Sequence, residues 1–142
     1  MAKSICDIAV ISIPRSGSKS LVDIYCEKYH KLPAYGVLHT PKYLGKNDYD
    51  VEAIIKGHKH VLHGHWHTIN ELAPELQAYI RDHYRIVTVT RPMLDILSSL
   101  DRIIDLPYQQ VEDILADILD KSSMVYDKWD IEKSYEFHKL YN

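Results

Sequence analysis

Apolar and polar residues alternate along this chain of 142 residues in blocks that predict strands followed by helices. The segment from Ile8 to Ile13 is a run of apolar, mostly β-branched residues, which is typical of a strand buried on both faces. A second strand and its exit are predicted at residues 61–67, and a third strand at residues 84–90. The spacing of apolar residues predicts helices at residues 17–30, 50–56, 74–83, 93–104 and 111–119.

Strands that alternate with helices predict an α/β fold, with a three-layer parallel sheet and helices on both of its faces. Residues 1–142 have the length of one domain, and no repeat or linker divides them. Residues 33–48, which proline and glycine punctuate, are expected to be irregular. The C-terminal part, including residues 124–142, is expected to be helical. Because the carboxyl ends of parallel strands lie at one edge, segments 14–20, 63–67 and 91–99 are expected to meet in one cleft.

Composition limits the classes of function. Hydrophobic residues make up 46% and charged residues 26% of the chain, as is ordinary for a soluble globular protein. The net charge of −3 at pH 7 argues against a general nucleic-acid binder, which normally has a basic excess. Cys6 and Cys26 form no disulfide framework and no metal motif. Since no signal-peptide region or membrane-spanning run is present, we expect a cytoplasmic protein without a membrane partner.

The first predicted strand leads into the first helix through Pro14-Arg15-Ser16-Gly17-Ser18-Lys19-Ser20. In such a turn, backbone N–H groups and the positive end of the helix converge on one point, and Arg15 and Lys19 add full charges there. A phosphate-like group is the natural ligand. The Gly-x-x-x-x-Gly-Lys-Ser/Thr frame of the ATP and GTP P-loop is absent. The alternative is an ordinary strand-to-helix turn with Ser or Gly at the helix N-cap.

Two segments resemble motifs of the sulfotransferases that use PAPS (3′-phosphoadenosine 5′-phosphosulfate). Segment 14–20 resembles the loop that binds the 5′-phosphosulfate. Segment 91–99 is similar to the family's Arg-x-Pro-x-x-x-x-x-Ser motif for the 3′-phosphate, with Pro92 one position early and Ser98 as a second choice if the register shifts. Pairing of Arg91 with Asp95 or Asp101 is the alternative. The resemblance implies a P-loop-like fold of the sulfotransferase type. It also implies that PAPS or its product PAP is bound by Arg15, Ser16, Gly17, Ser18, Lys19, Ser20, Arg91 and Ser99.

Five histidines fall within ten residues, at positions 58, 60, 63, 65 and 67. On a strand, His63, His65 and His67 point to one face. Three interpretations stay open: a general base, a zinc site of three imidazoles, or a partly exposed surface rich in histidine. Sulfotransferases frequently carry a Gly-His or His-x-His segment near the acceptor. The resemblance therefore implies His65 as the first choice for the base and His67 as the second.

The resemblance implies transfer of a sulfuryl group from PAPS to a hydroxyl or amine of a small-molecule or carbohydrate acceptor, with release of PAP and without a metal. The catalytic residues would be Arg15, Lys19, His65 and His67. Arg15 stands where many members have a catalytic lysine, and Lys19 would donate the proton that an arginine holds too firmly to release. In several branches of the sulfotransferase family, a late Arg-Lys-Gly segment completes the 3′-phosphate site, and this chain lacks that segment. A second subunit of a homo-oligomer is one way to complete the 3′-phosphate site. The alternatives are a non-catalytic phosphate- or nucleotide-binding module and a metal-binding protein built on the histidines.

Overall fold

The computed structural model describes residues 5–38, 50–129 and 136–139. Within these residues it contains five strands and five α-helices, together with one short 3-10 helix. In chain order the elements are β1 (Ile8–Ser12), α1 (Ser18–Tyr29), β2 (Leu32–Ala34), α3 (Val51–Gly57), β3 (His60–His65), η1 (Ile69–Glu71), α4 (Pro74–His83), β4 (Arg85–Thr90), α5 (Met93–Ile103), α6 (Tyr108–Trp129) and β5 (Glu136–Lys139). Residues 39–49 of the segment predicted to be irregular lie outside the described residues.

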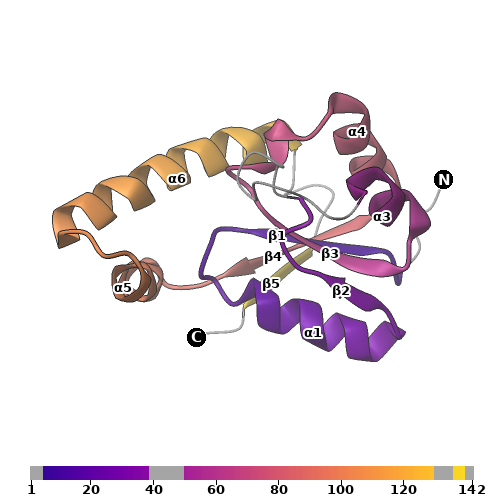
Figure 1. The fold of residues 1–142 in the computed structure, drawn as a ribbon, viewed down its shortest axis with the longest axis horizontal. Helices are drawn as coiled ribbons and strands as arrows, with labels where there is room; N and C mark the ends of the chain where they lie inside the picture. The colour runs from indigo at the N-terminus through magenta and orange to yellow at the C-terminus, as the bar shows by residue number, and fades with distance from the viewer. Residues whose placement is uncertain (1–4, 39–49, 130–135, 140–142) are drawn as a thin grey trace.

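The strands form one parallel sheet in the order β2-β3-β1-β4-β5, with β1 in the centre (Figure 1). Val10 of β1 is in register with His63 of β3 on one side and with Val87 of β4 on the other. Helix α1 covers one face of the sheet, and α3, α4 and α6 cover the other (Figure 1). The predicted α/β fold with a parallel sheet between two layers of helices is therefore confirmed.

The apolar run of β1 is continuous because both of its faces are covered. Ile8 and Val10 pack with α1 through residues such as Val22, whereas Ala9 and Ile11 belong to the core under α3, α4 and α6. Every residue of β1 is buried. Successive side chains of a strand point to opposite faces, so a strand between two helical layers needs apolar residues at consecutive positions.

Several helix boundaries follow from local signals in the sequence. Pro74 occupies the first turn of α4, where its missing N–H is not required. The Asp50 carboxylate accepts a hydrogen bond from the Ala53 N–H at 3.2 Å and caps α3. Helices α5 and α6 share a small core that includes Ile96 and Val111. The predicted helices therefore occur, and residues 124–129 belong to the last one.

Two short strands differ from the prediction. Residues 32–34 form β2, although irregular structure was expected from residue 33 onward, and residues 136–139 form β5 where a helix was expected. Both are edge strands, since β2 pairs only with β3 and β5 only with β4 in the described sheet. Pro33 fits an edge strand because it has no N–H to donate to a second neighbour. Tertiary pairing decides such short segments, which carry no periodic pattern of their own.

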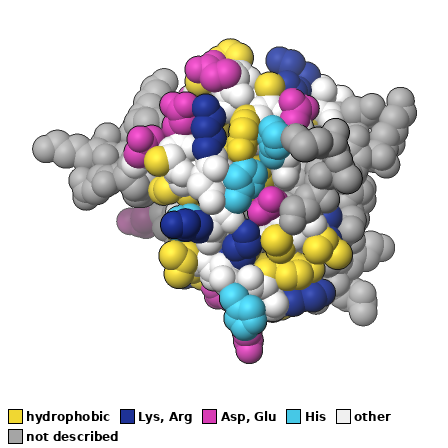
Figure 2. Space-filling model, turned by 90° about the vertical axis from the view of Figure 1, so that its right-hand side faces the viewer, with side chains coloured by type: hydrophobic (Ala, Val, Ile, Leu, Met, Phe, Trp, Pro, Cys, Tyr) yellow, Lys and Arg dark blue, Asp and Glu magenta, His cyan; other side chains and the backbone are white. Residues whose placement is uncertain are grey.

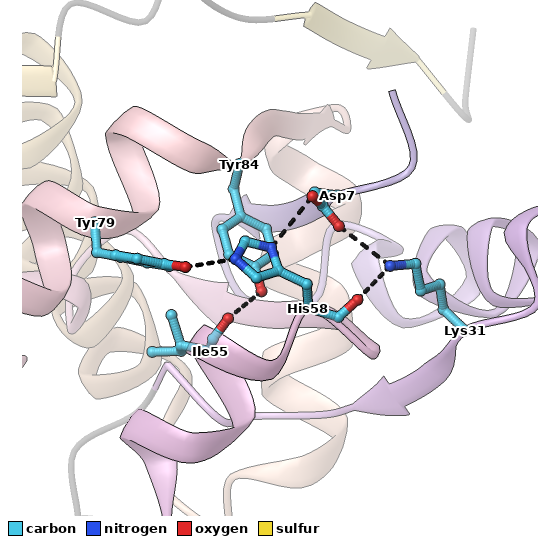
Figure 3. Close-up of polar contacts among 6 residues, drawn as sticks. All are labelled: Asp7, Lys31, Ile55, His58, Tyr79 and Tyr84. Carbon is cyan, nitrogen blue, oxygen red and sulfur yellow. Dashed lines mark hydrogen bonds and ion pairs between the residues drawn. The ribbon is translucent and has the colours of Figure 1, made fainter. Parts of the chain in front are cut away.

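A polar cluster closes the amino end of the sheet. Figure 2 faces this end and shows His, basic and acidic side chains close together near its centre. Asp7, Lys31 and Tyr84 stand directly before β1, β2 and β4, and His58 stands two residues before β3 (Figure 3). The Lys31 Nζ donates to the Asp7 carboxylate at 3.1 Å and also to the His58 carbonyl oxygen. The His58 Nδ1 lies 3.2 Å from the other oxygen of Asp7. These contacts join the starts of neighbouring strands.

Two tyrosines complete this cluster from the side of α3 and α4 (Figure 3). The Tyr79 hydroxyl lies 2.5 Å from the His58 Nε2. The Tyr84 ring stacks on the His58 ring at 5.0 Å, and its hydroxyl donates to the Ile55 carbonyl oxygen. Tyr84 is fully buried. Burial, aided by the nearby Asp7 and Tyr79, raises the pKa of Tyr84 above its ordinary value.

The raised pKa makes the stability of the protein depend on pH in the alkaline range. The pKa of Tyr84 is higher in the folded than in the unfolded state. The contribution of Tyr84 to the free energy of unfolding is therefore complete below about pH 10 and is lost as the pH rises further. We expect Tyr84→Phe to cost about 1–2 kcal/mol at pH 7, through loss of the hydrogen bond to Ile55. Between about pH 10 and 11, the free energy of unfolding of Tyr84→Phe should fall less steeply with pH than that of the wild type. The two slopes should differ by up to about 1.4 kcal/mol per pH unit.

The measurement is urea unfolding at a series of pH values. Tyr108→Phe is the matched control, because Tyr108 is 51% exposed and its removal should leave the slope of the wild type unchanged. Equal slopes for the wild type and Tyr84→Phe would contradict the prediction.

Candidate functional site

The candidate site lies at the carboxyl ends of the three central strands. After β1 the chain turns to α1 on one face of the sheet, and after β3 it turns to α4 on the other face. A crevice forms where neighbouring strands send their connections in opposite directions, and such crevices are the usual ligand sites of open parallel sheets. Here the crevice is a cavity of about 350 Å³. It is lined by Pro14, Arg15, Gly17, Ser18, Lys19, His63, His65 and Arg91.

The loop after β1 is shaped to present the start of α1 to this cavity. The Ser16 hydroxyl is buried and donates to the Ile13 carbonyl oxygen at 2.6 Å, which tightens the turn. Gly17 is the N-cap of α1 and has a φ of 95°, in the left-handed region that glycine adopts without strain. Since Gly17 has no side chain, it gives the first N–H groups of α1 no capping hydrogen bond. An anion in the cavity can accept hydrogen bonds from those groups.

The two segments that resemble sulfotransferase motifs are joined directly. The Arg15 Nε donates to the Ser99 hydroxyl at 2.8 Å, and the Arg91 Nη1 donates to the Arg15 carbonyl oxygen at 2.7 Å. Ser99 is buried on α5, whereas its neighbour Ser98 is exposed. Ser99 therefore contacts a residue that lines the cavity, but Ser99 itself, like Ser16, is not among the lining residues. Ser20 is exposed on α1 and is not among the lining residues.

The cavity has a strongly positive character. Arg15, Lys19 and Arg91 line it, and none of the described lining residues is acidic. The Lys19 Nζ lies 5.0 Å from the centre of the Tyr35 ring, in a cation–π contact that limits where the ammonium group can go. The site can therefore accept a ligand that carries more than one negative charge.

His63 takes a role that the sequence analysis did not assign to it. It is a buried residue, and its Nδ1 accepts a hydrogen bond from the Gly36 N–H at 3.0 Å. A backbone N–H only donates, so Nδ1 carries no proton and the neutral ring has its proton on Nε2. That Nε2–H donates to the Ser18 hydroxyl at 2.8 Å, which leaves the Ser18 proton to be donated elsewhere. Strand alternation signals this placement, because His63 is in register with Val10, which faces α1.

The other two histidines of the segment lie differently. His65 lines the cavity, and its ring centre is 5.2 Å from that of His63 and 5.9 Å from that of His67. Strand β3 ends at His65, within the segment predicted as a strand and its exit, and His67 lines a separate hollow of about 220 Å³ with Glu71 and Lys121. In residues 5–38, 50–129 and 136–139, no three or more His, Cys, Asp or Glu side chains are gathered so as to hold a metal ion.

No known protein family matches this chain, and no curated protein matches it either. None of the helices in the described part is both long and apolar enough to span a membrane. The residues of the cavity therefore carry the functional argument alone.

Gly64 lies between the two site histidines, and its lack of a side chain is required there. A Cβ at this position would be 2.4 Å from the Cβ of Leu38, which is fully buried. The Leu38 N–H also donates to the His63 carbonyl oxygen. We expect Gly64→Ala to lower the free energy of unfolding by about 1–3 kcal/mol, because the segment after β2 must move away from β3.

Gly57→Ala is the control for this prediction. A Cβ at Gly57 meets no atom within 4 Å, and alanine suits a helix better than glycine does. We expect this variant to be as stable as the wild type or slightly more so. The urea midpoints of the two variants measure the difference, and equal midpoints would rule out the steric argument.

Proposed function

We propose that this chain is a PAPS-dependent sulfotransferase with a P-loop-like fold. The observation that carries the proposal is a pair of hydrogen bonds at Arg15. Its side chain donates to the Ser99 hydroxyl, and its carbonyl oxygen accepts from Arg91. The two segments that resemble the motifs for the 5′-phosphosulfate and the 3′-phosphate thus lie against each other at one cationic cavity. A donor with two anionic groups could receive charge-assisted hydrogen bonds from both segments.

The residues of the loop would bind the phosphosulfate end of PAPS. The start of α1, the Ser18 hydroxyl and the Lys19 ammonium group offer hydrogen bonds and charge to its oxygens. Arg15 and Arg91 add planar guanidinium groups that suit phosphate geometry. During transfer, negative charge builds up on the oxygen that leaves with the 5′-phosphate, and fixed cations and N–H dipoles stabilise that charge.

His65 is the candidate for the general base. It lines the same cavity as the loop and can take the proton of an acceptor hydroxyl. The S–O bond to the 5′-phosphate would break as the bond from sulfur to the acceptor oxygen forms, and PAP would leave with Lys19 as the proton donor. His63 would act as a positioning residue, since its two ring nitrogens are used by Gly36 and Ser18.

The first test is calorimetric titration of the protein with PAP, without metal, and with ATP–Mg²⁺ for comparison. We expect PAP to bind independently of magnesium. Arg91→Ala should weaken PAP binding roughly 10- to 100-fold, through loss of charged hydrogen bonds. Arg102→Ala, which removes an exposed arginine of α5, is the control and should bind PAP like the wild type. A preference for ATP–Mg²⁺, or an unchanged affinity of Arg91→Ala, would contradict the proposal.

His65→Ala separates catalysis from binding. We expect this variant to bind PAP within about twofold of the wild type and to lose about 10²- to 10⁴-fold in the rate of sulfuryl transfer, the usual contribution of a general base. The assay measures PAP release from PAPS in the presence of an acceptor. PAP binding without any turnover in the wild type would instead identify a non-catalytic nucleotide-binding module.

A further inference from the structure

A second space adjoins the cationic cavity and differs from it in chemistry. It is a groove of about 320 Å³ at the carboxyl ends of the strands, between the sheet and helices α5 and α6. Its walls include the aliphatic side chains of Ile13, Val89 and Ile96, together with Met93 at the start of α5. A smaller hollow of about 210 Å³ under α6 shares Ile13 with it. The groove is therefore mostly carbon-lined, in contrast to the cavity.

The groove and the cavity share one lining residue, and two further pairs of lining residues are consecutive in the chain. Arg91 lines both of them. Ile13 lines the groove and the next residue, Pro14, lines the cavity. His65 lines the cavity and the next residue, Trp66, lines the groove. Arg91 therefore stands between a ligand in the groove and the cavity that holds the candidate base.

Packing contacts hold the aromatic wall of the groove, in which Trp66 is almost entirely buried and Tyr126 is half-buried. The Trp66 ring packs edge-on against Tyr126 at 5.6 Å and against Trp129 at 5.7 Å between ring centres. Its indole N–H donates to the Thr88 hydroxyl at 3.2 Å, so a polar group of the wall is already engaged. Fixed aromatic surfaces with few polar groups are typical of sites for apolar ligands.

This chemistry separates two classes of acceptor. A carbohydrate carries hydroxyls on all sides, and each hydroxyl buried without a partner costs about 1–3 kcal/mol. An apolar ring with one hydroxyl gains from burial of its carbon surface and has only one polar group to satisfy. The volume of the groove falls in the range of small-molecule sites.

We infer that the acceptor is an uncharged, apolar compound with a single hydroxyl, such as a phenol, rather than a carbohydrate. Its ring would lie in the groove against Trp66 and Tyr126, and its hydroxyl would point past Arg91 toward His65. This inference rests on the proposed function and narrows its substrate class.

The test uses 2-naphthol as the apolar probe and methyl glucoside as the polar probe, each titrated into the full chain with and without saturating PAP. We expect 2-naphthol to bind and to be sulfated from PAPS, and the glucoside to do neither. Met93→Gln places an amide in the groove wall and should weaken 2-naphthol binding about tenfold, with PAP affinity unchanged. Leu94→Gln, the next residue in the same helical turn and 74% exposed, is the control and should bind 2-naphthol normally.

The outcomes distinguish this inference from the proposed function. If PAP binds but 2-naphthol does not, or if the glucoside is the better acceptor, the inference is overturned and the proposed function stands. If Met93→Gln weakens PAP and not 2-naphthol, the groove holds the nucleoside of the donor and the inference is overturned. If PAP does not bind, the proposed function fails, while binding of 2-naphthol that Met93→Gln weakens would still support the groove as an apolar site.

Discussion

The hydrogen bonds that hold Arg15 are the interactions on which the site depends. Arg15 has a φ of 65°, a left-handed conformation that costs a non-glycine residue roughly 1–2 kcal/mol. The Arg91 bond to its carbonyl oxygen and the Ser99 bond to its side chain hold the residue in that conformation. They therefore stabilise the turn in which Arg15 and Gly17 line the cavity at the start of α1. The strand β4 and the helix α5 thus determine the shape of a loop that is more than 70 residues away in the chain.

The two ends of the sheet differ in how their polar and charged side chains are arranged. At the amino end, Asp7, Lys31, His58 and Tyr84 bond with one another or with the neighbouring backbone, and they fix the starts of four strands. At the carboxyl end, Arg15, Lys19 and Arg91 line a cavity none of whose described lining residues is acidic. Because strands are stiff and their register is fixed by backbone pairing, order at the amino end also fixes the positions of the carboxyl ends. Like charges can then be held together in the cavity, where an anion would relieve their repulsion.

Much of this arrangement follows from the sequence. The apolar run of β1, the Ser-Gly turn after it and Pro74 carry local signals, and the structure has the strand, the turn and the helix that they predict. The hydrogen bond between Arg15 and Ser99 brings segments 14–20 and 91–99 together. The edge strands β2 and β5 could not be predicted, because three or four residues hold no pattern and their pairing depends on β3 and β4. The role of His63 was missed for a related reason. Its tautomer depends on the Gly36 N–H, and that contact exists only once β2 lies beside β3.

The neutrality of His63 bears on what the cavity can accept. A fourth cationic residue, an arginine or a lysine at this position, would strengthen anion binding on the side of β3, where the acceptor is proposed to react. Instead, β3 contributes a buried imidazole that donates one hydrogen bond to Ser18, while the full charges come from the loop after β1 and from Arg91. Charge is thus concentrated where the donor's anionic groups would lie. An anionic acceptor would compete with the donor for those same cations, whereas an uncharged hydroxyl compound would leave them to the donor. The electrostatics of the cavity and the apolar walls of the adjoining groove therefore favour the same kind of acceptor on independent grounds.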